Sequence, residues 1–297
     1  MLALMAARGT RGRPPLGGTF LQFWADHLKW DGERWERLFG YLEALRVKEL
    51  VVQWSGYDGI GYGPLVERVL EMARGRGMRV RVGLRYESRW WKDVEASPAE
   101  ALKRLEARAS EIDPRWCAKV GREPAFEGWY LPEEIDDVHW RNGGAAKALG
   151  EVLRAVRKKV GRLAASGFAG GTAGPVEVAA FWKGLVKRSG LDEVLFQDGI
   201  GAGKLSLETW PAYAQALERA LGRRLRVVVE TFAASSGPGE FQAAPAALDR
   251  VLAQSRVAWR YSRKPPLAFS LPEYDTPEGG AAAAERYREY LGCMDWF

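Results

Sequence analysis

The sequence predicts a single (β/α)8 barrel, in which eight parallel strands form a closed ring inside a layer of helices. Short β-rich runs alternate with longer amphipathic stretches along the whole chain, and this alternation is typical of parallel strands joined by helical crossovers. Runs such as LVVQW and RVVVE lack a polar residue at every second position, as expected for strands buried on both faces. Eight strand-helix units in 297 residues, with no compositional break between them, favour one barrel over two domains.

The first four units are read from apolar periodicity and from helix stop and start signals. Trp35, Leu38 and Leu42 recur at three- and four-residue steps, which indicates a helix. Pro64 opens the next helix and Gly75 ends it. The expected strands and helices are, in pairs, 18–24 and 33–46, 49–54 and 64–74, 79–86 and 97–112, and 126–134 and 144–160.

The second half of the chain repeats this scheme. Its expected strands and helices are, in pairs, 162–169 and 175–187, 192–199 and 207–221, 224–232 and 246–254, and 266–275 and 281–290. Residues 1–16 are expected to form a flexible N-terminal lead, and residues 17–297 the catalytic barrel domain.

Composition excludes several classes of protein. With 47% hydrophobic residues the chain can build a core, so it is not a disordered protein. The net charge of +6 is spread over expected helix faces and predicts no nucleic-acid partner. Two cysteines, Cys117 and Cys293, and two histidines, His27 and His139, are too few for a disulfide framework or a His-rich metal centre. We therefore expect no metal and no organic cofactor.

The sequence has no apolar run of about 18 residues, so we expect no membrane span. The start, MLALMAARGTRGRPP, has its basic residues after its short apolar stretch, which is the reverse of a secretory signal. Localisation stays open: periplasmic or secreted if a signal precedes this sequence, and otherwise cytoplasmic.

Polar and aromatic residues gather at or near the expected carboxyl ends of the strands, where the loops of a (β/α)8 barrel form the active site. The chain has 13 Trp, more than packing alone requires. Trp35 and Trp182 have the spacing of helix packing residues, whereas tryptophans at strand ends could stack on sugar rings. The candidate substrate-binding residues are Gln22, Trp24, Gln53, Trp54, Tyr86, Glu87, Trp90, Trp91, Trp129, Asp198 and Glu273.

Two opposed carboxyl groups are the requirement for breaking a glycosidic bond: one protonates the leaving oxygen, and the other attacks the sugar or activates water. Glu134 at the end of the fourth strand is our candidate for the acid, with Glu133 close behind it, and Glu230 at the end of the seventh is our candidate nucleophile. Side chains alternate along a strand, so only one of Glu133 and Glu134 should face the cleft. The sequence thus predicts a glycoside hydrolase with a carbohydrate substrate.

Other interpretations stay open. Consecutive acids such as those at 133–137 are commonly a helix N-terminus, where the helix dipole favours negative charge. The chain could be a glycan-binding barrel without catalysis in exopolysaccharide handling, or a barrel enzyme that uses a metal or a phosphate. The glycine-rich segment DGIGAGK (198–204) departs from the phosphate-loop pattern at both Asp198 and Leu205, and we interpret it as a flexible rim.

Several segments also resemble a known family. GTFLQFW, VVQW, GWYLPEEID and FQDGIG, which lie between residues 18 and 201, resemble domain-of-unknown-function family 4434, a bacterial family placed beside the glycoside hydrolases. The resemblance implies a TIM barrel with glycoside-hydrolase-like architecture, often in exported proteins, and no established substrate. The glutamates of the fourth and seventh strands are also similar to those of the retaining barrel glycosidases, although Glu133 stands where that clan has an asparagine.

Overall fold

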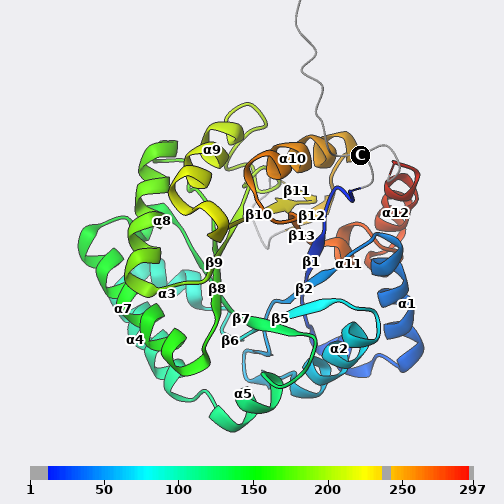
Figure 1. Cartoon of the computed structure of the whole chain (residues 1–297), viewed down its shortest axis with the longest axis horizontal. Coiled ribbons are helices and arrows are strands. Elements are labelled where there is room, and N and C mark those ends of the chain that lie inside the picture. Colours follow the sequence, from blue (N-terminus) through cyan, green and yellow to red (C-terminus); the bar gives the residue numbers. More distant parts are fainter. Residues whose placement is uncertain (1–12, 236–241, 294–297) are drawn as a thin grey trace, which may run out of the picture.

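The computed structural model describes residues 13–235 and 242–293, and within these residues eight parallel strands close into a barrel (Figure 1). The prediction of a single (β/α)8 barrel is confirmed. Each strand pairs in parallel with its neighbours in chain order, and the last pairs with the first. The strands are β1 (Gly18–Leu21), β2 (Glu49–Val52), β5 (Arg79–Gly83), β7 (Phe126–Ile135), β8 (Leu163–Gly167), β9 (Glu193–Gln197), β10 (Leu225–Glu230) and β13 (Leu267–Phe269).

Helices cover the outside of this ring (Figure 1). The larger ones are α1 (Gly32–Ala44), α2 (Gly63–Gly75), α4 (Pro98–Ser110), α7 (Gly143–Val160), α8 (Pro175–Ser189), α9 (Trp210–Leu221), α10 (Leu248–Tyr261) and α12 (Ala281–Cys293). Shorter ones are η1 (Ala25–Lys29), α3 (Trp90–Ala96), α5 (Pro114–Val120), α6 (Asp137–Trp140), η2 (Gly222–Arg224), α11 (Leu271–Tyr274) and η3 (Pro277–Gly279). None of the helices in the described ranges is long and apolar enough to span a bilayer.

The third crossover departs from the expected single helix. Residues 90–96 form their own helix α3, and Ser97 then caps α4 by accepting a hydrogen bond from the Glu100 backbone amide. Pro98, which follows this cap, suits the first turn of a helix because it lacks an amide hydrogen. A further helix, α5, completes the crossover before β7.

Two small sheets stand beyond the barrel strands. The hairpin β3 (Gly56–Tyr57) and β4 (Ile60–Gly61) pairs with β6 (Arg85–Tyr86), and β11 (Phe232–Ala234) pairs with β12 (Ala243–Pro245). Both sheets follow carboxyl ends of barrel strands, so they build up the face where we expect the active site.

Two expectations at the chain ends are wrong in part. Residues 1–12 lie outside the described residues, but Pro14–Leu16, expected to belong to the flexible lead, pack against the barrel. Leu16 is fully buried, and the indole of Trp259 on α10 donates a hydrogen bond to the Pro15 carbonyl at 3.0 Å. The last strand is also shorter than expected: it ends at Phe269, and α11 follows one residue later.

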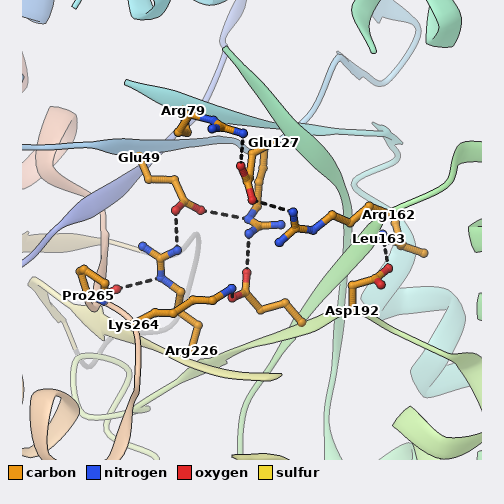
Figure 2. A network of polar contacts seen from close by, with 11 residues as sticks. Glu49, Arg79, Glu127, Arg162, Leu163, Asp192, Arg226, Lys264 and Pro265 are labelled. Carbon is orange, nitrogen blue, oxygen red and sulfur yellow. Dashed lines mark hydrogen bonds and ion pairs between the residues drawn. The ribbon is translucent and has the colours of Figure 1, made fainter. Parts of the chain in front are cut away.

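A buried ionic network fills the barrel at the amino ends of its strands (Figure 2). Arg81 on β5 contacts Glu49 at 3.0 Å and Glu193 at 2.6 Å, and its side chain is only 1% exposed. Arg226 on β10 pairs with Glu49 and donates to the Pro265 carbonyl at 2.8 Å. Lys264 reaches Glu193 from outside the strands. Charges can be buried in this way when their mutual attraction and their hydrogen bonds offset the loss of hydration.

An apolar layer separates this network from the carboxyl ends. It consists of inward-facing residues two positions further along the strands: Phe20, Val51, Tyr130, Ala164, Leu195, Val228 and Leu267. The ring of Phe20 lies edge-on to that of Tyr130 at 5.5 Å, and the Tyr130 hydroxyl shares a hydrogen bond with Ser166 at 2.6 Å. At this level the barrel interior is therefore packed with side chains of the described residues, and the active site of such a barrel is expected at its carboxyl end.

Arg81→Met tests the ionic network, because it leaves Glu49 and Glu193 buried with one fewer partner each. We expect a loss of about 3–5 kcal/mol in the free energy of unfolding, measured by equilibrium denaturation. The matched control is Arg79→Met on the same strand, whose side chain is 55% exposed and pairs with Glu127. The control should lose less than about 1 kcal/mol. Equal losses in the two variants would contradict a dominant role for the network.

Candidate active site

A cavity of about 260 Å³ lies at the carboxyl ends of the strands and brings Glu134 and Glu230 together. Glu134 comes from β7 and Glu230 from β10, so two intervening strands separate them around the barrel. The other lining residues are Trp91, Phe168, Gln197, Gly199, Ala202, Lys204, Phe232 and Phe269. The pair of glutamates expected to face each other over a substrate thus lines one cavity.

Alternation along β7 decides which of its two glutamates reaches the cavity. Tyr130 faces the barrel interior and Leu131 packs outward against the helices. Glu134 lines the inner cavity and Glu133 an outer one, so the alternation continues across the register shift between Leu131 and Ile135. Glu133 is ion-paired with Arg108 on α4 and lines a different cavity. This position contradicts the interpretation of Glu133 as a possible acid of the same site.

Glu134 is surrounded by hydrogen-bond donors. The amide of Gln197 on β9 donates to its carboxylate, and so does the Trp91 side chain. Burial raises the pKa of Glu134, whereas the donors from Gln197 and Trp91 oppose this shift because they stabilise the charged form. The ring of Trp91 also lies 5.7 Å from that of Phe168, so the two form an aromatic wall beside the carboxylate.

Glu230 is covered by the glycine-rich loop that follows β9. The Ala202 amide donates to Glu230 Oε2 at 2.7 Å. This approach requires glycine at 201, because a Cβ there would lie 2.7 Å from the Cβ of Glu230 and 2.5 Å from the Phe232 carbonyl oxygen. The segment expected to be a flexible rim is therefore a loop held by hydrogen bonds to a candidate catalytic residue. Burial, followed by the negative charge of Asp198, raises the pKa of Glu230.

Asp198 is buried beside the backbone of Glu230 and is not among the residues that line the cavity. Its side chain is fully buried, and it accepts hydrogen bonds from Gln254 on α10 at 2.6 Å and from the Ile200 amide at 3.2 Å. The Glu230 amide also points to it, at 3.4 Å. The Asp198 side chain has no exposed surface that a substrate could contact, so the expectation that it binds substrate is not met in this structure. Gln254 carries no signal in the sequence, because its role arises only when α10 packs behind β9 and β10.

An aromatic cluster follows β1, β2 and β5. Trp24 is 40% exposed, and its ring lies edge-on to Trp54 at 5.2 Å and to Tyr57 at 5.4 Å. Trp54 in turn stacks on Tyr86, with ring centroids 5.6 Å apart and planes 13° from parallel. The charges of Glu134 and Glu133 act on the hydroxyl of Tyr86 and help to raise its pKa, second to burial. The cluster lies beyond the ends of β2 and β5, where Tyr57 of β3 pairs with Tyr86 of β6 in a small sheet.

Several candidate substrate-binding residues lie elsewhere. Trp90 is buried, stacks on Trp140 at 5.8 Å and donates to the Glu134 backbone carbonyl at 3.1 Å. Trp129 is buried against Trp116 and Phe126. Both rings are packing residues, and their prediction as sugar contacts is wrong for this structure. Helical placement explains Trp90, which lies in α3 and not at a strand end.

The remaining candidates lie around the site but not on the cavity wall. Gln22 and Gln53 follow β1 and β2, and Gln53 is buried. Glu87 pairs with Arg108 at 3.1 Å, outside the barrel. Glu273 lies in α11, beyond the end of the last strand. Four further residues line the cavity without having been predicted as ligand contacts: Phe168, Lys204, Phe232 and Phe269.

Among the described residues, no group of three or more His, Cys, Asp or Glu side chains could hold a metal ion together. The candidate site consists of two carboxyl groups, an amide, a lysine and aromatic rings. These groups can donate and accept protons and can contact the apolar faces and the hydroxyls of a polar ring.

Residues 16–279 match the family model described as Domain of unknown function (DUF4434). A curated relative from Escherichia coli strain K12, uncharacterized protein YbcH, is 27% identical over 201 residues. The match covers 62% of this chain and 64% of the relative, so the chain spans less than two thirds of that protein's length.

Solved structures share the barrel. A candidate alpha-L-fucosidase from Bacteroides thetaiotaomicron has a TM-score of 0.74 and 18% identity, covering 98% of this chain and 99% of its own. A GH18 chitinase from Pseudoalteromonas aurantia has a TM-score of 0.53 and 8% identity, covering 94% and 99%. An intracellular xylanase from Thermoanaerobacterium saccharolyticum has a TM-score of 0.52 and 13% identity, covering 87% and 89%. The chain therefore has a glycoside-hydrolase-like barrel, and the likeness extends to the fold alone.

Glu273→Gln tests whether the Glu273 carboxyl group has a higher pKa in the folded protein than in the unfolded chain. Burial raises the pKa of Glu273 to about 8 from a usual value of 4.5. The folded protein therefore holds this proton more tightly than the unfolded chain does, and stability is lost as pH rises through this range. Between pH 5 and pH 9, the free energy of unfolding should fall less in the variant than in the wild type, because the variant lacks this titrating group. Each unit of pKa difference between the folded and the unfolded state corresponds to about 1.4 kcal/mol. Urea denaturation at both pH values measures this.

The control is Glu43→Gln, whose side chain is 59% exposed on α1. Its stability should follow the pH dependence of the wild type. An unchanged pH dependence in Glu273→Gln would show that Glu273 does not hold its proton in the folded protein.

Proposed function

For this chain, which belongs to domain-of-unknown-function family 4434 by a match over residues 16–279, we propose the activity of a glycoside hydrolase. Its substrate would be an oligosaccharide or a polysaccharide. The observation that carries this proposal is the 260 Å³ cavity that Glu134 and Glu230 line from β7 and β10. Two carboxyl groups facing one cavity are what glycosidic bond cleavage requires.

The charges around the pair suggest which carboxyl group carries the proton. Two carboxyl groups in one desolvated cavity disfavour simultaneous ionisation. Gln197 and Trp91 donate hydrogen bonds to Glu134 and favour its carboxylate form. Asp198 beside Glu230 accepts hydrogen bonds from several donors, which favours a charge on Asp198 and disfavours one on Glu230. We therefore assign the proton to Glu230 in the free protein, which reverses the roles expected from the sequence.

In this proposal Glu230 protonates the leaving oxygen of the glycosidic bond. The Glu134 carboxylate acts on the anomeric carbon from the other side, either directly or through a water molecule that it activates. The Gln197 amide holds Glu134 in place while it does so. The Ala202 amide, at 2.7 Å from Glu230 Oε2, stabilises the carboxylate that Glu230 becomes after it gives up its proton.

Aromatic rings supply the surfaces for the sugar. Trp91 and Phe168 line the cavity itself, and the exposed ring of Trp24 packs with Trp54 and Tyr57 in a separate cluster beyond the ends of β1 and β2. The C–H faces of pyranose rings are apolar, so such rings can bury them. We expect a substrate of more than one sugar residue to contact both aromatic surfaces.

A polysaccharide screen with reducing-end detection tests the proposal on the wild type, Glu134→Gln and Glu230→Gln together. Each variant should lower kcat by about 10²–10⁴-fold on a substrate that the wild type cleaves, since each removes one acid-base or nucleophilic group. Glu43→Gln on the surface of α1 is the matched control and should keep full activity.

Aryl glycosides separate the two roles. A good leaving group needs no protonation, so Glu230→Gln should regain much of its activity on such substrates, whereas Glu134→Gln should stay inactive. The opposite pattern would restore the roles expected from the sequence. Full hydrolysis of the natural substrate by Glu230→Gln would overturn the mechanism, and wild-type binding of a glycan without cleavage would favour a binding barrel.

Trp24→Ala tests the aromatic surface. Trp24 is 40% exposed, so its removal should leave folding intact and mainly weaken substrate binding. We expect KM for an oligosaccharide to rise several-fold, which corresponds to about 0.5–1.5 kcal/mol for one ring contact, with kcat changed little. Leu28→Ala, a change at another exposed apolar side chain near β1, is the control and should leave KM unchanged. An unaltered KM in Trp24→Ala would place the substrate elsewhere.

A further inference from the structure

A second cavity, of about 370 Å³, lies outside the barrel wall and is distinct from the cavity of Glu134 and Glu230. Its walls come from α4, from the start of α5, from the β3–β4 hairpin, from β6 and from the outward face of β7. Leu105, Ile112 and Trp116 are among its apolar walls. A volume above 300 Å³ is in the range of sites that bind small molecules.

Two side chains that line this cavity carry buried polar atoms without hydrogen-bond partners. Arg108 contacts Glu87 at 3.1 Å and also pairs with Glu133, whose side chain is only 1% exposed. Glu133 Oε2 and Arg108 Nε are both buried without a hydrogen-bond partner among the described residues. A buried polar atom in this state costs about 1–3 kcal/mol, and a ligand in the cavity can remove this cost by supplying a hydrogen-bond donor to Glu133.

The charge of the lining is opposite to that of the protein. Four acidic residues, Glu87, Glu111, Asp113 and Glu133, stand against two basic ones, Arg85 and Arg108. The lining therefore carries a formal charge of about −2, whereas the chain as a whole carries +6. This local excess of acids favours a cationic ligand and disfavours an anionic one.

Trp116 adds a flat apolar surface. Its ring is half-buried, lies 5.4 Å from that of Trp129 and lines the cavity. An indole ring can pack against an apolar ring face and can also attract an ammonium group through its π system. The cavity thus combines an aromatic wall, aliphatic walls and an acidic end.

We propose that this cavity binds a six-membered-ring ligand that carries an ammonium group, with the ring against Trp116 and the ammonium group directed to Glu133. Two sources share this chemistry: an amino sugar, free or as a residue of a glycan, and a small alicyclic amine. The site stands on its own residues and goes beyond the proposed hydrolase activity. Tyr86 lines this cavity and also stacks on Trp54, so a bound amino sugar would lie next to the aromatic cluster.

Isothermal titration calorimetry on the full chain tests the proposal with two matched pairs of ligands. Glucosamine is compared with glucose, and cyclohexylamine with cyclohexanol, at a pH at which both amines are protonated. We expect at least one amine to bind at least tenfold more tightly than its neutral counterpart, which is about 1.4 kcal/mol. Preference for glucosamine identifies an amino sugar site, and preference for cyclohexylamine identifies a site for alicyclic amines. Equal binding of amines and neutral rings, or no binding of either amine at millimolar concentration, would overturn the proposal.

Variants locate the binding. Glu133→Gln should weaken amine binding at least tenfold, but it also changes a buried ion pair. Gly63→Leu is therefore the second variant: a Cβ at residue 63 lies 3.9 Å from Trp116 Nε1 in otherwise open space, so the side chain should fill the cavity without disturbing the fold. Amine binding should be lost in Gly63→Leu, with the thermal unfolding midpoint unchanged.

Glu230→Gln separates this inference from the proposed function. It alters the catalytic cavity only, so amine binding in the second cavity should stay as in the wild type even if the protein proves to have no hydrolase activity. Loss of amine binding in Glu230→Gln, with binding kept in Gly63→Leu, would place the amine in the catalytic cavity and overturn the proposal.

Discussion

Side chains alternate with a period of two residues along each barrel strand, and this constraint determines the residues at both the amino and the carboxyl end of the barrel. On β9 the inward positions are Glu193, Leu195 and Gln197, and on β10 they are Arg226, Val228 and Glu230. One register therefore places an ion-paired residue at the amino end, an apolar residue in the middle and a cavity residue at the carboxyl end. A shift of one residue in either strand would move all three to the helix side at once.

The same period explains the different environments of the two neighbouring glutamates on β7. The Glu134 side chain points into the barrel and accepts a hydrogen bond from Gln197. The Glu133 side chain points outward and forms an ion pair with Arg108. Burial raises the pKa of both carboxyl groups, but the charge of Arg108 opposes the shift at Glu133. A raised pKa by itself thus does not identify a catalytic group. The second glutamate in the cavity, Glu230, does distinguish the two.

The fold, and the placement of Glu134 and Glu230 at the carboxyl ends of their strands, could be predicted from the sequence because these follow from local pattern. Strand runs, helix caps and the parity of positions along a strand are all visible in the chain. The positions that the sequence misplaced depend on packing between distant segments. Trp90 was expected at a strand end, but residues 90–96 form a helix that turns its ring onto Trp140. Asp198 was expected to face a ligand, but its carboxylate is buried and accepts a hydrogen bond from Gln254 on α10.

The apolar layer of Phe20, Val51, Tyr130, Leu195 and Val228 has a consequence for how such a protein can diversify. It lies between the ion pairs that hold the strands and the loops that shape the cavity, so substitutions in one zone need not disturb the other. Loops after the strands can lengthen, shorten or exchange their aromatic residues while the amino-terminal ion pairs stay fixed. The barrel is in this sense divided along its own axis into a zone that holds the strands together and a zone that forms the cavity.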